Sequence, residues 1–186
     1  MKNHKSFLRK ILIDEETLQN RIVELGSEIS RDYEGKDPHL ICILRGGVMF
    51  LTDLMRQISV PHTIDFMAIS SYGKGKRESS GQVRLSMDLK DNIHGRHVLL
   101  VEDIIDSGNT LYSVLELLNV RKPASLKICT LLDKIDRREV SVPVDYVGFV
   151  IPDKFVFGYG LDLDEYYRNL PFIGIVDLNK FQPPDE

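Results

Sequence analysis

HVLLVEDIIDSGNT, residues 97–110, is the stretch of sequence that decides the fold. Its apolar run Val98–Val101 predicts a buried strand of a parallel sheet. Two carboxylates, Glu102 and Asp103, follow this run directly. In open α/β sheets, this carboxyl end of the strands is where ligands bind. Residues 106–110 then form a turn that opens a helical period, so the stretch predicts an α/β protein with a ligand site at this edge.

The loop after the predicted strand combines groups that suit a phosphorylated sugar. Ser107 or Asn109 is expected to cap the following helix, and Gly108 lets the backbone approach a ligand closely. The loop amides, the hydroxyls of Ser107 and Thr110, and the helix N-terminus suit a monoester phosphate. The acids before the loop suit sugar hydroxyls and, through them, a divalent cation. An ordinary strand–turn–helix explains the loop, but it does not explain acids crowded at one strand end.

The composition excludes several classes of function. The chain has 186 residues, which can bury a sizeable core, and we expect one domain over residues 1–186. A net charge of −4 provides no basic field, so neither nucleic acid nor a membrane is expected as a partner. The apolar runs are too short to span a bilayer, and no apolar stretch of signal-peptide length follows the basic N-terminus. We therefore expect a cytoplasmic protein.

Neither the cysteines nor the histidines suggest a metal or redox site. Cys42 and Cys129 lie within apolar runs and are expected in the core rather than in a disulfide. The five histidines are scattered without the spacing of common metal-binding pairs, so a histidine metal site is not expected.

The remaining segments alternate between helices and strands. Apolar residues on one face predict a helix from Ile13 to Ile29, with Asp14 capping its start. A second helix is expected over residues 48–57. Further predicted strands cover residues 39–44, 63–70, 83–89, 124–132, 145–152 and 172–177.

Two loops are further candidates for ligand contact. Arg45-Gly46-Gly47 follows a predicted buried strand, and glycines there expose backbone amides to a ligand. Residues 71–82 are rich in glycine and basic residues, with Ser71 and Tyr72 at the base. This segment is either a hairpin connection or a lid that closes over an anionic substrate. We prefer the lid, because long loops inside compact domains are usually functional.

Residues 97–110 resemble the motif that binds phosphoribosyl pyrophosphate (PRPP) in the type I phosphoribosyltransferases. The family pattern is an apolar run, two acids, two apolar residues, Asp, and a Thr/Ser-Gly-x-Thr loop, and every position matches here. The alternative, the acidic strand end of P-loop nucleotidases, needs a glycine-rich Lys-Ser/Thr loop that this chain lacks. The resemblance extends from about Leu40 to Asp177 and is closest to the hypoxanthine-guanine members of the family.

The resemblance implies a fold and a division of the chain. The expected architecture is the α/β type I phosphoribosyltransferase fold, with a mostly parallel central sheet flanked by helices and a small purine-binding hood. The PRPP-binding core is expected over about residues 14–135, and the hood over about residues 1–13 and 145–186. Members of this family are usually homodimers or homotetramers, so one of these assemblies is expected.

The resemblance also assigns roles to individual residues. Asp106 is the expected general base, and Mg²⁺, the implied cofactor, is expected near Glu102, Asp103 and Asp162. The PRPP- and nucleotide-binding set is Arg45, Gly46, Glu102, Asp103, Ile104, Ile105, Asp106, Ser107, Gly108, Asn109, Thr110 and Arg168. The purine-binding set is Lys134, Phe155, Val156 and Asp162, and the lid residues are Ser71 and Tyr72. The family often has a cis peptide before the basic residue of the Arg-Gly pair, which is Leu44–Arg45 here.

Lys134 bears on the identity of the base. A lysine donates hydrogen bonds and never accepts them, so it suits the O6 atom of a 6-oxopurine and opposes a 6-amino group. In the family the lysine at this position contacts O6, Phe155 stacks on the base, and Arg168 contacts pyrophosphate. Without the resemblance, Lys134 would more often be a surface residue, and Arg137 and Arg138 are expected in solvent.

The implied reaction is purine salvage: transfer of the 5-phosphoribosyl group from PRPP to hypoxanthine or guanine, giving IMP or GMP and pyrophosphate. An alternative from another class is a regulatory protein of the same fold that senses PRPP or nucleotides and binds RNA. The acidic balance of the chain disfavours that alternative. Transfer to a pyrimidine or to adenine is a third possibility, which Lys134 and Phe155 oppose.

Overall fold

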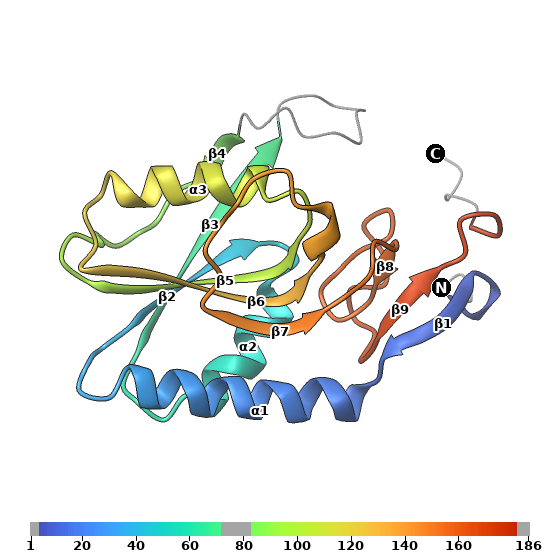
Figure 1. Ribbon diagram of the computed structural model, residues 1–186, viewed down its shortest axis with the longest axis horizontal. Coiled ribbons are helices and arrows are strands. Elements are labelled where there is room, and N and C mark those ends of the chain that lie inside the picture. The colour runs from blue at the N-terminus through green and yellow to red at the C-terminus, as the bar shows by residue number, and fades with distance from the viewer. Residues whose placement is uncertain (1–3, 72–82, 182–186) are drawn as a thin grey trace.

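The computed structural model describes residues 4–71 and 83–181, and within these ranges the chain forms two sheets (Figure 1). The larger sheet contains β2 (His39–Leu44), β3 (Thr63–Ser71), β4 (Val83–Met87), β5 (His97–Ile105), β6 (Ser125–Asp133) and β7 (Tyr146–Val150). The strand order is β4-β3-β2-β5-β6-β7, and neighbouring strands are parallel except at the β3–β4 edge. The mostly parallel central sheet predicted from the sequence is confirmed.

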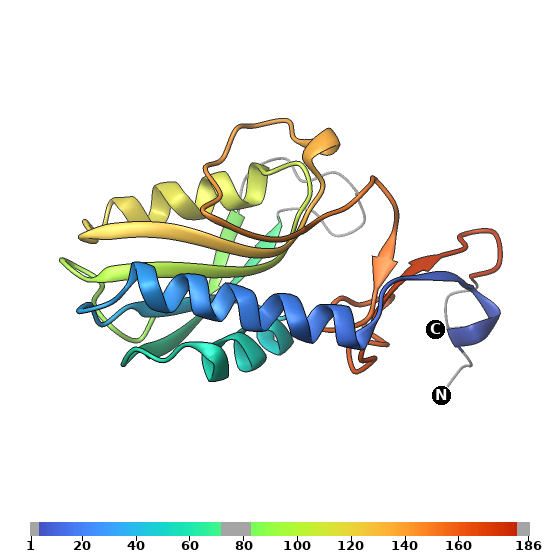
Figure 2. The same ribbon diagram turned by 60° about the horizontal axis from the view of Figure 1, so that its bottom comes forward.

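Helices cover both faces of this sheet (Figures 1 and 2). α1 (Glu15–Asp32) and α2 (Val48–Gln57) lie on one face, and α3 (Asn109–Asn119) lies on the other. The side chain of Asp14 caps α1 by accepting a hydrogen bond from Thr17 N at 2.8 Å, as predicted. The apolar stripes of the helices face the sheet, which is why the alternating pattern of helices and strands folds into three layers.

β5 lies inside the larger sheet, between β2 and β6. Val98–Val101 have no exposed surface, because the helices cover the strand from both faces. The strand is longer than the predicted apolar run: it continues through Glu102 and Asp103 to Ile105, still paired with β6. The acids therefore lie on the last part of a strand whose position the core fixes.

The second sheet is small and antiparallel, with the order β1-β9-β8. Its strands are β1 (Leu8–Ile13), β8 (Val156–Phe157) and β9 (Ile173–Val176), and Figure 1 shows them beyond the end of the larger sheet. Phe7, Phe157 and Tyr167 make edge-on and tilted ring contacts that fill the space behind this sheet. This sheet joins strands from the two segments, residues 1–13 and 145–186, over which the hood is expected, and we use that name for it below.

Several predicted boundaries differ from the structure. β1 and β8 were not predicted, because β1 carries basic residues among its apolar ones and β8 is only two residues long. Ile13 ends β1 rather than beginning α1. The strand predicted over 145–152 is β7, which covers Tyr146–Val150 and pairs with β6 in the larger sheet. The strand predicted over 83–89 ends at Met87.

Two short 3₁₀ helices complete the described elements, η1 (His4–Ser6) and η2 (Ile135–Arg137).

Cys42 and Cys129 are buried free thiols in the core, as expected. Among the described residues, no helix is both long and apolar enough to cross a membrane.

Candidate active site

The candidate site lies where β2, β5 and β6 end. These neighbouring strands are parallel, so their carboxyl ends share one edge of the sheet. Arg45 and Gly46 follow β2, the acids end β5, and Lys134 follows β6. The sheet topology therefore brings together three segments that the sequence separates by many residues.

Glu102 and Asp103 form the acidic floor of the site. Oε2 of Glu102 is buried and accepts no hydrogen bond from the part of the chain that the structure describes. Burial, and then the charge of Asp103, raise the pKa of Glu102 well above its usual range. Burial also raises the pKa of Asp103 to about 6, although the backbone amide of Ile104 and the charge of Arg168 oppose this shift. Two crowded acids of this kind fit a ligand that brings hydroxyl groups or a cation.

Gly46 touches this acidic floor directly. A Cβ atom at Gly46 would overlap Oδ2 of Asp103, so a side chain at this position would displace the carboxylate. A Cβ at Gly160, whose φ is 93°, would in turn overlap the carbonyl oxygen of Gly46. The Leu44–Arg45 peptide is cis, as it often is in the family that the sequence resembles. The loop after β2 thus fits between β5 and the hood, and only a glycine fits at either contact.

Hydrogen bonds to residues 139 and 140 hold the loop between β5 and α3 in place. Gly108 is the N-cap residue of α3 with φ 86°, so the prediction that Ser107 or Asn109 caps this helix is wrong. Asn109 is instead the first helical residue, and its side-chain amide donates to Glu139 Oε2 at 2.6 Å. The Ser107 carbonyl accepts the amides of residues 139 and 140 at 2.9 and 3.3 Å. One segment, residues 139–140, therefore fixes the loop at two positions, and the backbone amides of the loop lie at the N-terminus of α3.

Lys134 lies in a cluster of ion pairs at the end of β6. Its side chain is 7% exposed, so it is a buried lysine and not the surface residue that the sequence alone suggested. Its Nζ atom lies 3.6 Å from Asp106 Oδ2 and 3.5 Å from Asp153 Oδ1. Arg137 binds the same two acids, with Nε 3.0 Å from Asp106 Oδ1 and Nη1 3.2 Å from Asp153 Oδ1. Asp106, the expected general base, thus lies between two cations.

The neighbouring arginine is also not free in solvent. Arg138 is 15% exposed on its side chain and donates from Nε and Nη2 to Oδ1 of buried Asp133, at 3.1 and 2.8 Å. The expectation that Arg138 is solvated is therefore wrong, whereas Arg137 is exposed as expected, although it pairs with Asp106 and Asp153. The reason is that the buried carboxylate of Asp133 requires a paired cation, and the turn after β6 returns the guanidinium of Arg138 to the strand end.

The hood supplies an aromatic side chain and a buried backbone segment. Phe155 is 48% exposed, and its ring is therefore available to a planar ligand. Val156 is buried and pairs with Ile175 of β9, which fixes the backbone beside Phe155. The amide of Ile151 donates to the carbonyl of Asp133 at 2.9 Å, so the hood segment leaves the core beside Lys134.

A second ion-pair cluster joins the hood to the loop after β2. Arg168 donates to Gly160 O at 2.8 Å and contacts Asp162 Oδ1 at 3.0 Å. Glu165 Oε2 bridges Arg168 and Arg45, at 3.3 and 2.7 Å. Arg45 and Glu165 are mostly exposed, so their pairing is weak and can be exchanged for a ligand anion. The cluster places two arginines close to the acidic floor.

Most of the residues proposed from the sequence meet at this edge. Ile105 is buried in the core, and the backbone of Ile104 bonds the side chain of Asp103. Ser71 ends β3, while Tyr72 and the rest of the proposed lid lie outside the described residues. Thr110 is the second residue of α3.

Sequence reasoning missed three charged residues of the site: Arg137, Asp153 and Glu165. Each was visible only as one charge in a loop. Their closeness in the sequence to predicted site residues could have indicated two of them: Arg137 follows Lys134 by three residues, and Asp153 precedes Phe155 by two. Most of their partners follow other strands, as Asp106 does for Arg137 and Arg45 does for Glu165, and local sequence does not reveal such pairs.

Comparison with known proteins agrees with this geometry. The family described as phosphoribosyl transferase domain matches residues 12–165. The hypoxanthine phosphoribosyltransferase of Salmonella typhimurium is 52% identical over 171 residues, which cover 91% of this chain and 96% of that protein.

Solved structures are similar over most of the chain. A hypoxanthine phosphoribosyltransferase from Staphylococcus aureus has a TM-score of 0.89 and 47% identity, and the match covers 95% of this chain and 96% of that one. A hypoxanthine-guanine phosphoribosyltransferase from Bacillus anthracis has a TM-score of 0.87 and 48% identity, over 91% of this chain and 99% of that one. The chain therefore belongs to the phosphoribosyltransferase family.

Proposed function

We propose that this protein transfers the 5-phosphoribosyl group of PRPP to hypoxanthine or guanine, giving IMP or GMP and releasing pyrophosphate. The observation that carries this proposal is the position of Lys134. This buried lysine lies 3.6 Å from Asp106, at the entrance of the loop that suits a sugar phosphate. A hydrogen-bond donor for a base and an anion-binding loop for a ribose phosphate are therefore adjacent, and the similar proteins named above carry the same activity in their names.

The phosphoribosyl group would be held by the end of β5 and the loop after it. We assign the ribose hydroxyls to Glu102 and Asp103, and the 5′-phosphate to Ser107, Gly108 and Thr110 with the N-terminus of α3. Asn109 belongs to the same loop through its backbone amide. The 5′-phosphate lies far from the C1′–O bond that breaks, so the energy of binding this phosphate serves to orient the sugar.

The acidic floor fits a divalent cation. Glu102 has a buried oxygen without a hydrogen-bond donor in the described ranges, and burial raises the pKa of both acids, so a bound cation would favour their charged forms. We propose that Glu102, Asp103 and Asp162 help to hold Mg²⁺ and its water or hydroxyl ligands. The ion, when bound, neutralises charge on the pyrophosphate leaving group.

The base would lie between Lys134 and the hood. Lys134 donates to O6 of the purine, Phe155 stacks on the ring, and the backbone of Val156 faces its far edge. Asp106 accepts the N7 proton of the base while N9 forms its bond to C1′ of the ribose. The C1′–O bond to pyrophosphate breaks in the same reaction.

The leaving pyrophosphate would meet the loop after β2 and the second ion-pair cluster. The backbone of Arg45 and Gly46 and the guanidinium of Arg168 provide donors beside the acidic floor. Because Glu165 holds both arginines through exposed contacts, pyrophosphate can replace it at little cost.

Further aspects stay proposals. We propose that residues 1–186 form one domain, with the PRPP-binding core and the hood as its parts, and that it assembles as a homodimer or homotetramer. Light scattering after size exclusion measures this assembly. A cytoplasmic location and closure of a lid at Ser71 and Tyr72 stay predictions. The regulatory alternative has no support among the similar proteins, whose names describe transferases.

One assay tests the proposed function. Purified protein is mixed with PRPP, Mg²⁺ and one base at a time (hypoxanthine, guanine, xanthine or adenine), and nucleotide is detected by chromatography. Nucleotide should form with hypoxanthine or guanine and stop when a chelator removes the divalent ion. Activity that survives excess chelator would rule out the metal, and nucleotide from adenine alone would contradict the role of Lys134. Retention of RNA at moderate salt without nucleotide formation would favour the regulatory alternative.

A further inference from the structure

We propose that His39, Asp65 and Asp91 form a second metal site, for a divalent transition-metal ion such as Zn²⁺, at the sheet edge opposite the candidate active site. One ligand atom from each residue lies within 4.8 Å of the others. His39 begins β2, and the candidate site begins after Leu44, the last residue of the same strand. At the rise of a β-strand, the two sites are about 17 Å apart.

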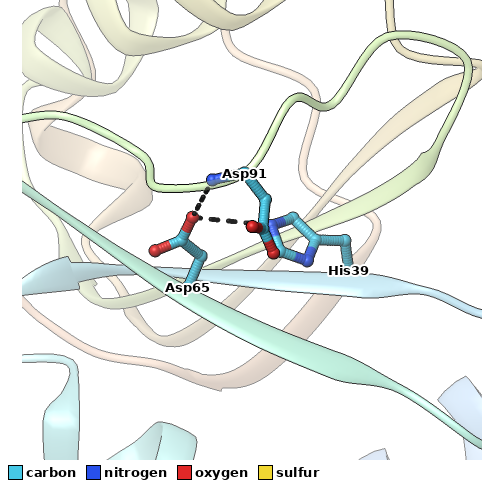
Figure 3. A group of neighbouring side chains, drawn as sticks. All are labelled: His39, Asp65 and Asp91. Atoms are coloured by element: carbon cyan, nitrogen blue, oxygen red, sulfur yellow. Dashed lines mark hydrogen bonds and ion pairs between the residues drawn. The ribbon is translucent and has the colours of Figure 1, made fainter.

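Figure 3 shows the carboxylates of Asp65 and Asp91 facing the imidazole of His39. The three residues come from β2, β3 and the loop before β5. His39 and Asp65 lie on adjacent parallel strands, two residues out of register, because His39 pairs with Thr63. Residues that are distant in the sequence thus meet through the sheet, which is why the spacing of histidines gave no sign of this group.

The imidazole of His39 points to a ligand. The residue has no exposed surface, and its Nε2 atom has no hydrogen-bond partner in the ranges 4–71 and 83–181. Oδ2 of Asp65 is 3.9 Å from Nε2, too far for a direct hydrogen bond. A buried ring nitrogen without a partner is costly, and a metal ion between the imidazole and the carboxylates would satisfy it.

The other ring nitrogen of His39 has the partner that metal-binding histidines need. Nδ1 lies 2.7 Å from Thr63 Oγ1, and Arg96 Nη2 donates to the same oxygen at 2.6 Å. If Nδ1 carries the proton and donates to Thr63, the lone pair of Nε2 is free to bind a metal. Burial, followed by the charge of Arg96, lowers the pKa of His39 and favours this neutral form.

The carboxylate of Asp65 is held in place. Its Oδ1 accepts Phe66 N at 2.8 Å, and its Oδ2 accepts Lys90 N and Asp91 N at 2.8 and 3.1 Å. Burial opposes the charge, yet these amides lower the pKa of Asp65, so the group is an anion at neutral pH. A ligating carboxylate that the backbone fixes in this way is typical of metal sites.

Asp91 would complete the site by a small movement. Zinc binds nitrogen and carboxylate oxygen at about 2.0–2.2 Å, so ligand atoms around it lie roughly 3.3 Å apart and the group must contract slightly. Asp91 has an exposed side chain, 49% accessible, whose nearest cation is Arg96 Nη1 at 4.0 Å. That long contact is easily exchanged for a metal ion, while water fills the remaining positions.

One imidazole with two carboxylates selects among metals. The nitrogen ligand disfavours Mg²⁺ and Ca²⁺, which prefer oxygen, and Zn²⁺ binds such mixed sites more strongly than Mn²⁺ or Fe²⁺. The site would tie β2 and β3 to the loop before β5, so a bound ion would stabilise the folded protein. This inference does not depend on the proposed transferase activity.

Calorimetric titration with Zn²⁺ tests the site. Untagged protein is titrated in excess Mg²⁺, which occupies oxygen-only sites such as the acidic floor near Glu102. We expect one Zn²⁺ per chain, a higher melting temperature with Zn²⁺, and at least tenfold weaker binding in both His39→Gln and Asp91→Asn. The matched controls, His94→Gln and Asp37→Asn, change exposed residues outside the group and should bind like the wild type.

A second measurement covers the case in which His39→Gln does not fold, since His39 is fully buried. In the wild-type protein, the ¹⁵N resonance of His39 Nε2 should move on addition of Zn²⁺, whereas that of His94 should not. Asp91 is exposed, so Asp91→Asn should fold in any case. An unmoved His39 resonance, or equal Zn²⁺ affinity in Asp91→Asn and the wild type, would overturn the proposal and leave a hydrogen-bonded cluster only.

Discussion

Nε of Arg137 lies 3.0 Å from Oδ1 of Asp106, so the acid expected to act as the general base has a guanidinium against it. Lys134 approaches the other oxygen at 3.6 Å. Both cations also contact Asp153, so Asp106 shares them with a second carboxylate. A purine that donates its N7 proton to Asp106 must therefore take the place of one of these contacts.

Replacing Asp106 by asparagine should lower turnover about 10²–10⁴-fold, the usual range for loss of a general base. The amide keeps the size of the side chain but cannot accept the proton. Steady-state rates with hypoxanthine and saturating PRPP measure the effect. Asp136→Asn, an exposed neighbour in η2, is the control and should retain wild-type turnover. Unchanged turnover in Asp106→Asn would remove this residue from the role.

Replacing Lys134 by alanine should reduce the preference for hypoxanthine over adenine about 10–100-fold. The estimate follows from the loss of one hydrogen bond from a charged donor, worth about 1.5–3 kcal/mol. Competition between the two bases gives the ratio of kcat/KM values. Lys154→Ala removes an exposed lysine of the hood segment and should keep the wild-type ratio. A ratio that Lys134→Ala leaves unaltered would refute the contact to O6.

The sequence predicted those parts of the site that one continuous stretch encodes. The run from Val98 to Thr110 carries the strand, the acids and the loop together, so local pattern was sufficient to place them. The local motif at Arg45-Gly46 pointed to a loop after β2, but whether the Leu44–Arg45 peptide is cis was settled only by the structure.

The ion pairs could not be predicted, because they depend on contacts between distant segments. Arg138 looked solvated in sequence, yet it is paired with buried Asp133 five residues earlier, across the turn after β6. The predicted cap of α3 was wrong for a related reason, because the side chain of Asn109 donates a hydrogen bond to Glu139, a residue of another loop. β1 escaped prediction since only pairing with β9 makes its short mixed segment a strand.

Gly46→Ala should lose affinity for PRPP as well as stability. The added Cβ would overlap Oδ2 of Asp103, so the carboxylate that is proposed to hold the ribose must move. We expect a KM for PRPP at least tenfold higher, together with a loss of about 1–3 kcal/mol in unfolding free energy from overpacking.

The matched control is Gly148→Ala. Its Cβ would lie 2.5 Å from the carbonyl oxygen of Leu131, so this variant is also overpacked, but on β7 and away from the proposed ligands. It should lose stability while its KM for PRPP stays near the wild-type value. Equal KM values for Gly46→Ala and Gly148→Ala would contradict the specific contact between Gly46 and Asp103.

The raised pKa of Asp103 predicts how stability depends on pH. Burial raises this pKa from 3.8 to about 6, so the folded protein holds the proton more tightly than the unfolded chain does. Ionisation of Asp103 therefore destabilises the fold. The contribution of this residue to the free energy of unfolding is highest below about pH 4, falls as the pH rises to about 6, and stays lower above it. Without metal, Asp103→Asn should exceed the wild type by up to about 3 kcal/mol at pH 7.5, and by less than about 1 kcal/mol at pH 4.

Urea unfolding at the two pH values, in chelator, measures this difference. Asp88→Asn, an exposed residue, is the control and should show the same offset from the wild type at both pH values. Added Mg²⁺ should stabilise the wild type more than Asp103→Asn, since the ion binds the ionised carboxylate and releases the cost of burying its charge. An Asp103→Asn protein no more stable than the wild type at pH 7.5 would show that the carboxylate is already neutralised within the fold, and the argument for a cation at the acidic floor would then fail.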